Sequence, residues 1–358
     1  MYIDAHLHPA DYLDLSASAG DTGNVDELFA QPVSLCCSAH DHIEYERHRR
    51  LFECTVCGDA GSPTTEIILK QKETHLQLSE KQHVLFSFGI HPQNPVTDEA
   101  DFLYRLLQTR QIHAIGECGF DLFNDEYKRL LPMQQKVWDM QLRWAQEFQL
   151  PVVIHCRKAL HLLFDSVPRL KKLPAVIFHG WGGSPQEATS FLKKGVNAYF
   201  SIGKAVLRGQ KSVCAMAASF DSTRLLTETD APYMRLKAED YSQPRDIIAV
   251  TAQCAKLRKM GTGAIQQTGT DAVKQTGAAA IKRADTDAVK QTGDVAAKQT
   301  GVATIKRAGA GAIHKAAVIS QYESCMAALE AIDISEDEVK EFSDTIARNF
   351  NCAFGLSD

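Results

Sequence analysis

No apolar run in this chain of 358 residues approaches the roughly 18 residues that cross a lipid bilayer. A secretory signal pattern is also missing, because Met1 to Ile3 lead directly into Asp4-Ala5-His6 without a basic start or an apolar core. Positive charge is not in excess, since the formal net charge is −5. We therefore expect a chain without membrane contact, in which any phosphate-bearing ligand is held by a local patch or by bound metal.

Well-spaced cysteine pairs are scarce, although the chain contains ten cysteines. Cys54-Thr55-Val56-Cys57 has only the pair Cys36-Cys37 nearby, and no second CxxC motif accompanies it. Zinc sites of the ribbon type need two such pairs, so we interpret these cysteines as structural or incidental. Scattered cysteines are typical of proteins in a reducing compartment, which predicts a cytoplasmic location.

Short apolar, β-branched runs alternate with stretches of helical periodicity along the chain. Several runs are too apolar to have one solvated face, which is typical of a parallel sheet covered by helices. The clearest helix is Leu130–Gln149. Eight strands alternating with helices predict an α/β fold of the TIM-type (β/α)8 barrel, although an open doubly wound sheet permits the same alternation. The expected strands are Met1–His6, Pro32–Cys37, Val84–Phe88, Ile112–Gly116, Pro151–His155, Pro174–Phe178, Val196–Phe200 and Arg224–Thr227.

A tandem repeat runs from Lys259 to His314 and divides into seven eight-residue units, beginning KMGTGAIQ, QTGTDAVK and QTGAAAIK. Eight residues advance about 80° around an α-helix, so no apolar stripe persists from one unit to the next. Glycine in most units also disfavours a helix. We interpret the repeat as a solvated insertion, disordered or weakly helical, within one barrel domain that spans residues 1–358. A binding arm built from the repeats is the alternative.

Polar side chains stand at the carboxyl ends of several expected strands, and these ends open on one face of a barrel. His6 and His8 point to the same side of their strand, where two imidazoles suit a divalent metal. Asp4 shares their parity and could orient a ligand from below. Four histidines and two carboxylates can hold two ions if one carboxylate bridges them, although each residue alone could be a buried polar group. The six residues are His6, His8, Glu117, His155, His179 and Asp230.

Six motifs in this order resemble the TatD family of metal-dependent deoxyribonucleases, which are amidohydrolase-like barrel enzymes. The resemblance covers nearly the whole chain except the repeats and part of residues 36–83. The first motif alone would indicate only the wider amidohydrolase superfamily. The motifs are Asp4-Ala5-His6-Leu7-His8, Gly89-Ile90-His91-Pro92, Gly116-Glu117-Cys118-Gly119-Phe120-Asp121, Ile154-His155-Cys156-Arg157, Phe178-His179-Gly180 and Thr227-Glu228-Thr229-Asp230-Ala231-Pro232.

The resemblance implies two divalent ions per subunit. His6, His8, Glu117 and Asp230 would surround one ion, and Glu117 would bridge to the second, which His155 and His179 would also hold. Enzymes of this family use magnesium, zinc or manganese. Ligation rich in histidine suits zinc or manganese better than magnesium, which prefers oxygen.

The implied reaction is hydrolysis of DNA phosphodiester bonds, by family analogy as a 3'-5' exonuclease. Two cations would lower the pKa of a bridging water, and the resulting hydroxide would attack phosphorus. Asp230 would take the proton, while His91 and Arg157 would contact phosphate oxygens. Arg157 could instead close a structural salt bridge, and His91 could only pack. Glu228 shares the parity of Asp230 and would support a ligand or lie near the phosphate.

Two other functions are compatible with the sequence. A deacylase or amidohydrolase that cleaves an ester or C–N bond would use the same metals, and a binding protein built on the repeats would not be an enzyme. A basic or aromatic rim around the site would favour a nucleic-acid strand. We expect a monomer that acts on DNA. The candidate rim residues are Tyr127, Lys128, Arg129, Trp181, Lys204, Arg208 and Lys211.

Overall fold

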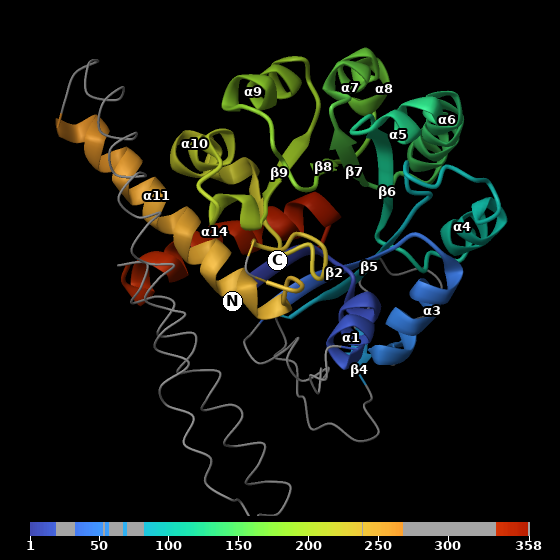
Figure 1. Cartoon of the computed structure of the whole chain (residues 1–358), viewed down its shortest axis with the longest axis horizontal. Helices are drawn as coiled ribbons and strands as arrows, with labels where there is room; N and C mark the ends of the chain where they lie inside the picture. Colours follow the sequence, from blue (N-terminus) through green and yellow to red (C-terminus); the bar gives the residue numbers. More distant parts are fainter. Residues whose placement is uncertain are drawn as a thin grey trace, which may run out of the picture.

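A sheet of eight strands forms the centre of the computed structural model, in the order β1-β2-β5-β6-β7-β8-β9-β10 (Figure 1). Every neighbouring pair in this order is parallel. The structure describes residues 1–18, 33–52, 54–56, 67–69, 82–237, 239–267 and 334–356. The strands are β1 (Tyr2–Leu7), β2 (Val33–Ala39), β5 (Val84–Phe88), β6 (Ala114–Asp121), β7 (Val152–Arg157), β8 (Val176–Phe178), β9 (Ala198–Ile202) and β10 (Leu225–Thr227). Each corresponds to one of the eight predicted strands, and β6 runs five residues beyond its predicted end.

Hydrogen bonds join the two outer strands, β1 and β10. The hydroxyl of Thr227 donates to the carbonyl of Ile3 at 2.7 Å. Beyond the end of β10, the N–H of Asp230 donates to the carbonyl of His6 in β1, at 2.9 Å. The result is a nearly closed parallel barrel, which confirms the predicted TIM-type fold over an open doubly wound sheet.

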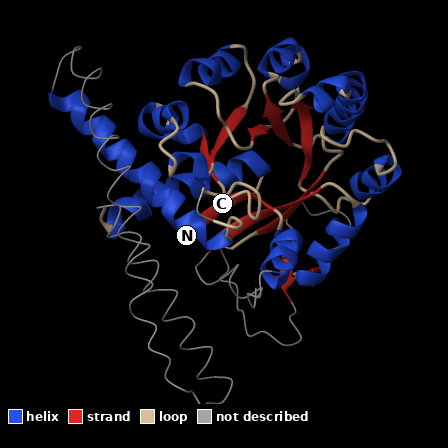
Figure 2. Cartoon of the chain, viewed as in Figure 1, coloured by secondary structure: helices blue, strands red, loops and turns tan. Residues whose placement is uncertain are grey.

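Helices surround this barrel (Figure 2). The predicted helix Leu130–Gln149 is α6 (Leu131–Phe148), which ends where Gln149 adopts a left-handed φ of 52°. A short antiparallel pair, β3 (Cys54–Val56) and β4 (Ile67–Leu69), is separate from the barrel sheet. The remaining helices are α1 (Pro9–Ser18), α3 (His42–Leu51), α4 (Ala100–Gln108), α5 (Asp125–Arg129), α7 (Leu160–Asp165), α8 (Val167–Leu170), α9 (Pro185–Lys193), α10 (Lys211–Ser219), α11 (Ile247–Gln267) and α14 (Glu336–Phe354), with 3-10 turns at Lys204–Val206, Ser222–Arg224 and Pro244–Asp246.

The first octad forms part of a regular helix. Helix α11 continues to Gln267 and so includes the unit that begins at Lys259. A Cβ atom on Gly261 would come within 2.8 Å of the carbonyl oxygen of Ala218, so glycine permits the close approach of α11 to α10. The first unit is therefore helical, which the interpretation as a disordered or weakly helical insertion allowed. The units after Gln267 lie outside the described residues, so the solvated insertion stays a prediction.

Helix α14 returns to the barrel and packs against β1, β10 and α11. A capping box between Ser335 and Glu338 starts this helix, because each residue's side chain bonds to the other's backbone N–H. The side-chain amide of Asn349 donates to the carbonyls of Ser222 and Leu225, at 2.6 and 2.7 Å. These contacts tie the C-terminal helix to the start of β10.

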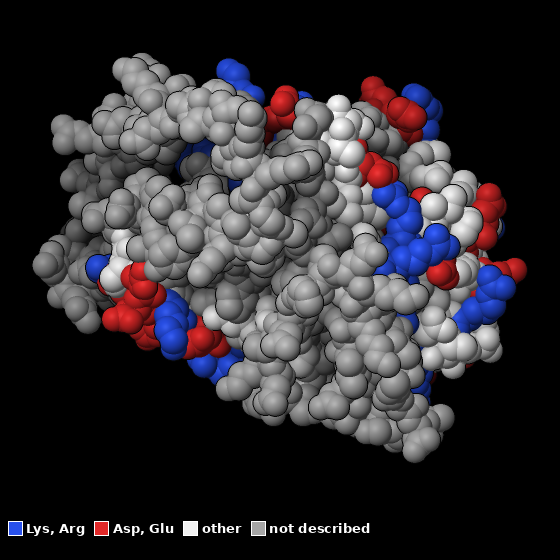
Figure 3. All heavy atoms as spheres, turned by 90° about the horizontal axis from the view of Figure 1, so that it is seen from below, with Lys and Arg blue, Asp and Glu red and all other residues white. Residues whose placement is uncertain are grey.

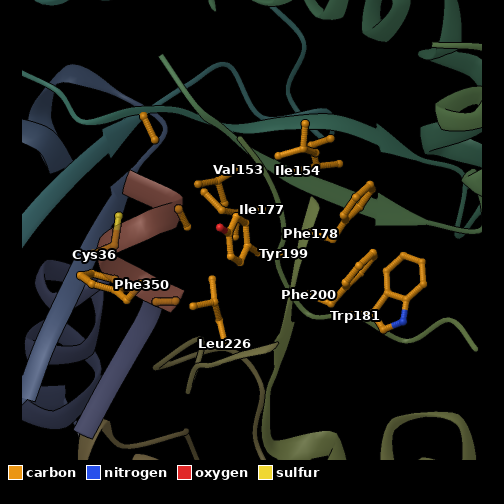
Figure 4. Close-up of a cluster of buried hydrophobic side chains, with 14 of the residues drawn as sticks. Cys36, Val153, Ile154, Ile177, Phe178, Trp181, Tyr199, Phe200, Leu226 and Phe350 are labelled. Atoms are coloured by element: carbon orange, nitrogen blue, oxygen red, sulfur yellow. The ribbon is translucent and has the colours of Figure 1, made fainter. Parts of the chain in front are cut away.

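Both faces of the sheet are buried, as the apolar strands predict. Phe178 and Phe200 face each other across β8 and β9, and their rings stack with centroids 5.2 Å apart (Figure 4). Trp181 packs on Phe200 at 4.8 Å. Ile177 and Tyr199, one position earlier on each strand, project to the opposite side of the sheet.

Charged side chains of both signs are interspersed on the described part of the face seen in Figure 3. This pattern agrees with the small net charge of −5, and the described residues of that face form no broad cationic field. Within the described residues, no helix combines the length and the apolar character that a bilayer span requires.

Candidate metal centre

The six residues expected to bind metal come together, with five of them around the buried carboxylate of the sixth, Glu117 on β6. Its Oε1 atom lies 3.0 Å from Nε2 of His6 and 3.1 Å from Nε2 of His8. Its Oε2 atom lies 2.9 Å from Nε2 of His179 and 3.2 Å from Nδ1 of His155. Each oxygen of one carboxylate therefore faces its own pair of imidazoles.

A break in the register of β6 places Glu117 at the centre. Ile115 pairs with Val152, but Cys118 pairs with Ile154, so β6 has one extra residue between these points. Such bulges redirect side chains and are common beside active sites. Gly119 permits the close contact with β7, because its φ is 136° and a Cβ there would lie 2.2 Å from the carbonyl oxygen of His155.

Asp230 and His91 approach this centre from separate loops. Oδ1 of Asp230 lies 3.7 and 3.9 Å from the Nε2 atoms of His6 and His8. Asp230 adopts a left-handed φ of 53°, which Asp tolerates better than most residues. Nε2 of His91 lies 3.3 Å from Nδ1 of His155 and 3.4 Å from Oε2 of Glu117.

Burial and the neighbouring rings set the charges of these groups. Burial alone would raise the pKa of Glu117, but His179, His6 and His91 together hold that pKa well below its usual range. Burial raises the pKa of Asp230, against the effect of His179 and His6. Burial also lowers the pKa of His91 to about 4, which keeps this imidazole neutral at neutral pH.

The arrangement of these ligand atoms suits a divalent cation better than it suits hydrogen bonds between the side chains. Nδ1 of His155 lies within 3.3 Å of nitrogen atoms of both His91 and His179, and of the carboxylate of Glu117. A ring nitrogen either donates or accepts, so these contacts cannot all be hydrogen bonds. Lone pairs that converge in this way suit zinc or another borderline divalent ion. Overlapping groups of these residues have ligand atoms within 4.8 Å of one another, namely His6 with Glu117 and His179, His6 with His8 and Asp230, and His91 with Glu117 and His155.

The far nitrogens of three histidines have partners that sequence reasoning missed. Nδ1 of His6 lies 2.8 Å from the hydroxyl of Ser38, and Nδ1 of His8 lies 2.8 Å from Oε1 of Glu44. Nε2 of His155 lies 3.1 Å from Oδ2 of Asp121. Such partners fix the tautomer and the orientation of a metal-ligating ring.

Asp4 orients the site differently from the expectation. Its carboxylate accepts hydrogen bonds from the N–H and the hydroxyl of Thr229, at 2.9 and 2.6 Å. Burial raises the pKa of Asp4 to about 8, although both bonds from Thr229 oppose this rise. Asp4 therefore holds the loop that carries Asp230, and it meets His6 at the backbone N–H rather than at the ring.

Glu44 on α3 joins the centre to a further histidine. Its Oε2 atom lies 2.7 Å from Nδ1 of His40, while Oε1 contacts His8. Burial would raise the pKa of Glu44, but His8 and His40 together hold it well below its usual range. The sequence offered one signal for this residue, the run His40-Asp41-His42 directly after β2, with Glu44 one helical turn beyond His40.

Two further residues that the sequence analysis predicted to support the ligands or the phosphate, Arg157 and Glu228, lie near the site. Arg157 is 46% exposed, with Nη1 at 3.9 Å from Asp121. Glu228 is buried, and its Oε1 atom accepts the N–H of Gly180 at 2.6 Å and lies 3.7 Å from Nδ1 of His179.

Two predicted rim residues are internal. Trp181 packs in the core, and Lys204 is fully buried with its ammonium 2.5 Å from both Glu239 and Asp246. The rim prediction is therefore wrong for these two residues. Tyr127, Lys128 and Arg129 lie on α5, which buries none of its residues.

Known relatives match about half of the chain. The chain is 34% identical over 177 residues to a 3'-5' ssDNA/RNA exonuclease TatD of Pantoea ananatis. The aligned residues cover 48% of this chain and 66% of that protein, so the match spans just under two thirds of the relative's length. It is 31% identical over 216 residues to the protein of the same name from Cronobacter sakazakii, covering 58% and 79%. An uncharacterized metal-dependent hydrolase of Methanocaldococcus jannaschii is 28% identical over 189 residues, covering 52% and 72%.

Solved structures share the fold. A TatD homologue from Escherichia coli K12 superposes with a TM-score of 0.52 at 23% identity, over 72% of this chain and 90% of that one. A TatD family hydrolase from Entamoeba histolytica gives a TM-score of 0.53 at 16% identity, over 72% and 91%. The family model described as TatD related DNase matches residues 3–276, well over half of the chain. The expected resemblance is confirmed, and this chain belongs to the TatD-related DNase family.

Proposed function

We propose that this protein is a metal-dependent nuclease that hydrolyses phosphodiester bonds of single-stranded DNA, from the 3' end. The observation that carries the proposal is the carboxylate of Glu117, with a pair of imidazoles facing each of its oxygens. The names of the relatives from Pantoea ananatis and Cronobacter sakazakii, both 3'-5' ssDNA/RNA exonucleases, support the choice of substrate.

The donor set divides into two places for a divalent ion. Oε1 of Glu117 would bind one ion together with His6, His8 and Asp230, and Oε2 would bind the other with His155 and His179. Zinc or manganese suits so many imidazoles better than magnesium. Two bound ions would lower the pKa of a water molecule and offset negative charge on a phosphate.

The protein's own groups would move the proton and hold the phosphate. Asp230 would accept the proton of the attacking water, because burial raises its pKa and so strengthens it as a base. His91, although neutral, would donate one hydrogen bond to a non-bridging oxygen of the phosphate. Arg157, half-exposed beyond His155 on β7, would pair with the same phosphate.

Substrate choice separates this proposal from its alternative, a deacylase or amidohydrolase with the same centre. Protein stripped of metal and supplied with Mn²⁺ should shorten an end-labelled single-stranded oligonucleotide faster than its duplex, and excess EDTA should stop the reaction. Hydrolysis of p-nitrophenyl acetate, measured in parallel, should stay at the rate of buffer with Mn²⁺. Metal-dependent ester hydrolysis without oligonucleotide cleavage would replace the proposal with the deacylase.

The partner of His8 should affect metal affinity. Glu44→Gln removes the charge that fixes the His8 tautomer, and we expect about 10- to 100-fold weaker binding of one ion, as is typical for such outer partners. Competition with a fluorescent chelator measures this affinity. Glu46→Gln, an exposed change on the same helix, is the matched control and should bind as the unaltered protein does. Equal affinity in both variants would show that Glu44 does not support the centre.

A further inference from the structure

An exposed aromatic ring lies just beyond the carboxyl end of β6, two residues after Asp121. Phe123 is 47% exposed, whereas most large apolar side chains of this barrel are buried. The guanidinium carbon of Arg157 lies 4.1 Å from the centre of its ring, and the ammonium of Lys158 lies 4.5 Å from it. One aromatic ring and two cations therefore form a small surface on the mouth of the barrel, where its active site would lie.

Hydrogen bonds place the backbone of Phe123 relative to the candidate metal centre. The N–H of Phe123 donates to Oδ1 of Asp121 at 2.8 Å, and Oδ2 of the same carboxylate lies 3.1 Å from Nε2 of His155. The side-chain amide of Gln93 also donates to Oδ2 of Asp121, at 2.8 Å. A buried carboxylate thus connects the backbone of Phe123 to a residue of the centre.

The two cations are held on the same structure. The N–H of Leu122 donates to the carbonyl of Arg157 at 2.8 Å, which extends the pairing of β6 with β7. Lys158 adopts a left-handed φ of 56°, uncommon for lysine, and its ammonium lies 3.3 Å from the carbonyl oxygen of Phe123. The strand ends therefore hold the backbone segments that carry all three side chains close together.

We propose that Phe123, Arg157 and Lys158 form a platform on which one unpaired nucleobase stacks, next to the phosphate in the metal centre. The proposal rests on the nuclease function argued above and gives a reason for single-strand preference. Aromatic rings and arginine planes bind bases of single strands by stacking, whereas bases within a duplex have their faces covered by neighbours. The cations at the ring would also attract the adjoining phosphates.

A base-deleted substrate tests the platform. Loss of one stacked base should raise KM of the unaltered protein by about tenfold, a typical size for one base–aromatic contact, with a smaller effect on kcat. The base-deleted substrate is a single strand with an abasic sugar at its 3'-terminal nucleotides. Phe123→Ala should raise KM on the normal strand to the value that the unaltered protein shows on the abasic strand. This variant should therefore have the same KM on both strands. Phe123→Trp should keep the discrimination. Met260→Ala, an exposed apolar change on α11, is the control and should behave as the unaltered protein does.

Binding without hydrolysis separates this proposal from the nuclease proposal. A single strand with 2-aminopurine at the same position should lose fluorescence on binding to metal-free protein, and Phe123→Ala should abolish that quenching. If the protein cleaves neither strand but quenches through Phe123, the nuclease proposal fails and the platform stands. The platform would be overturned if Phe123→Ala raised KM by the same factor on the base-bearing strand and on the abasic strand. Quenching that Phe123→Ala leaves unchanged would also overturn it.

Discussion

Glu117→Gln should abolish hydrolysis and remove bound metal together. The amide keeps the size of the side chain but loses the negative charge, and it directs an NH₂ group at imidazoles that the carboxylate oxygens now face. Because each oxygen of Glu117 contacts a different pair of rings, one substitution affects both proposed ion sites. We expect a loss of kcat/KM far beyond the roughly 10- to 100-fold typical of outer partners such as Glu44.

Metal content and rate, measured on the same preparation, test this result. Glu147→Gln, an exposed change on α6, is the matched control and should retain both. Thermal melting of the metal-free proteins checks that Glu117→Gln folds. A folded Glu117→Gln that keeps two ions and full activity would contradict the role of this carboxylate as the bridge.

Asp230→Asn should lower kcat by about 10²- to 10⁴-fold, the range for loss of a general base. The amide cannot accept a proton from water at neutral pH. Asn also tolerates the left-handed φ of 53° at this position, so the backbone should keep its conformation where Ala would be strained. The carboxylate lies 3.7 and 3.9 Å from the nearest imidazole nitrogens, farther than Glu117, so we expect most of the metal to remain bound.

Single-turnover rates on a single-stranded oligonucleotide measure this loss, and metal analysis of the same sample separates it from a loss of ions. Asp240→Asn, a carboxylate in the loop after β10 with no assigned role, is the matched control. An Asp230→Asn variant with unchanged kcat and a full complement of metal would show that another group accepts the proton.

The strands could be predicted because each is buried on both faces and therefore reads as a continuous apolar run. The end of β6 could not, since Glu117 is polar and was taken as the first residue after the strand. In the structure β6 continues through a bulge, and Gly119 lets it pass His155 closely. A register shift of this kind depends on contacts with β7, which periodicity within one strand does not reveal.

The position of the six candidate ligands followed from one rule, that parallel strands of a barrel end on the same face. Ser38 and Glu44 were missed because they support rings from other elements, and Glu44 lies on a helix rather than at a strand end. Lys204 was misjudged for the related reason that its partners, Glu239 and Asp246, lie far along the chain. Pairings between distant segments decide such cases, and residue spacing alone contains little information about them.

A titration of metal-free protein with Mn²⁺, with bound ions and oligonucleotide cleavage followed in the same samples, tests the central claim most directly. If Glu117 joins two ion sites that together hydrolyse a phosphodiester, cleavage should be absent without metal and should reach its plateau only as a second ion per chain binds. Full cleavage in excess EDTA, or a plateau reached with a single ion bound, would contradict it.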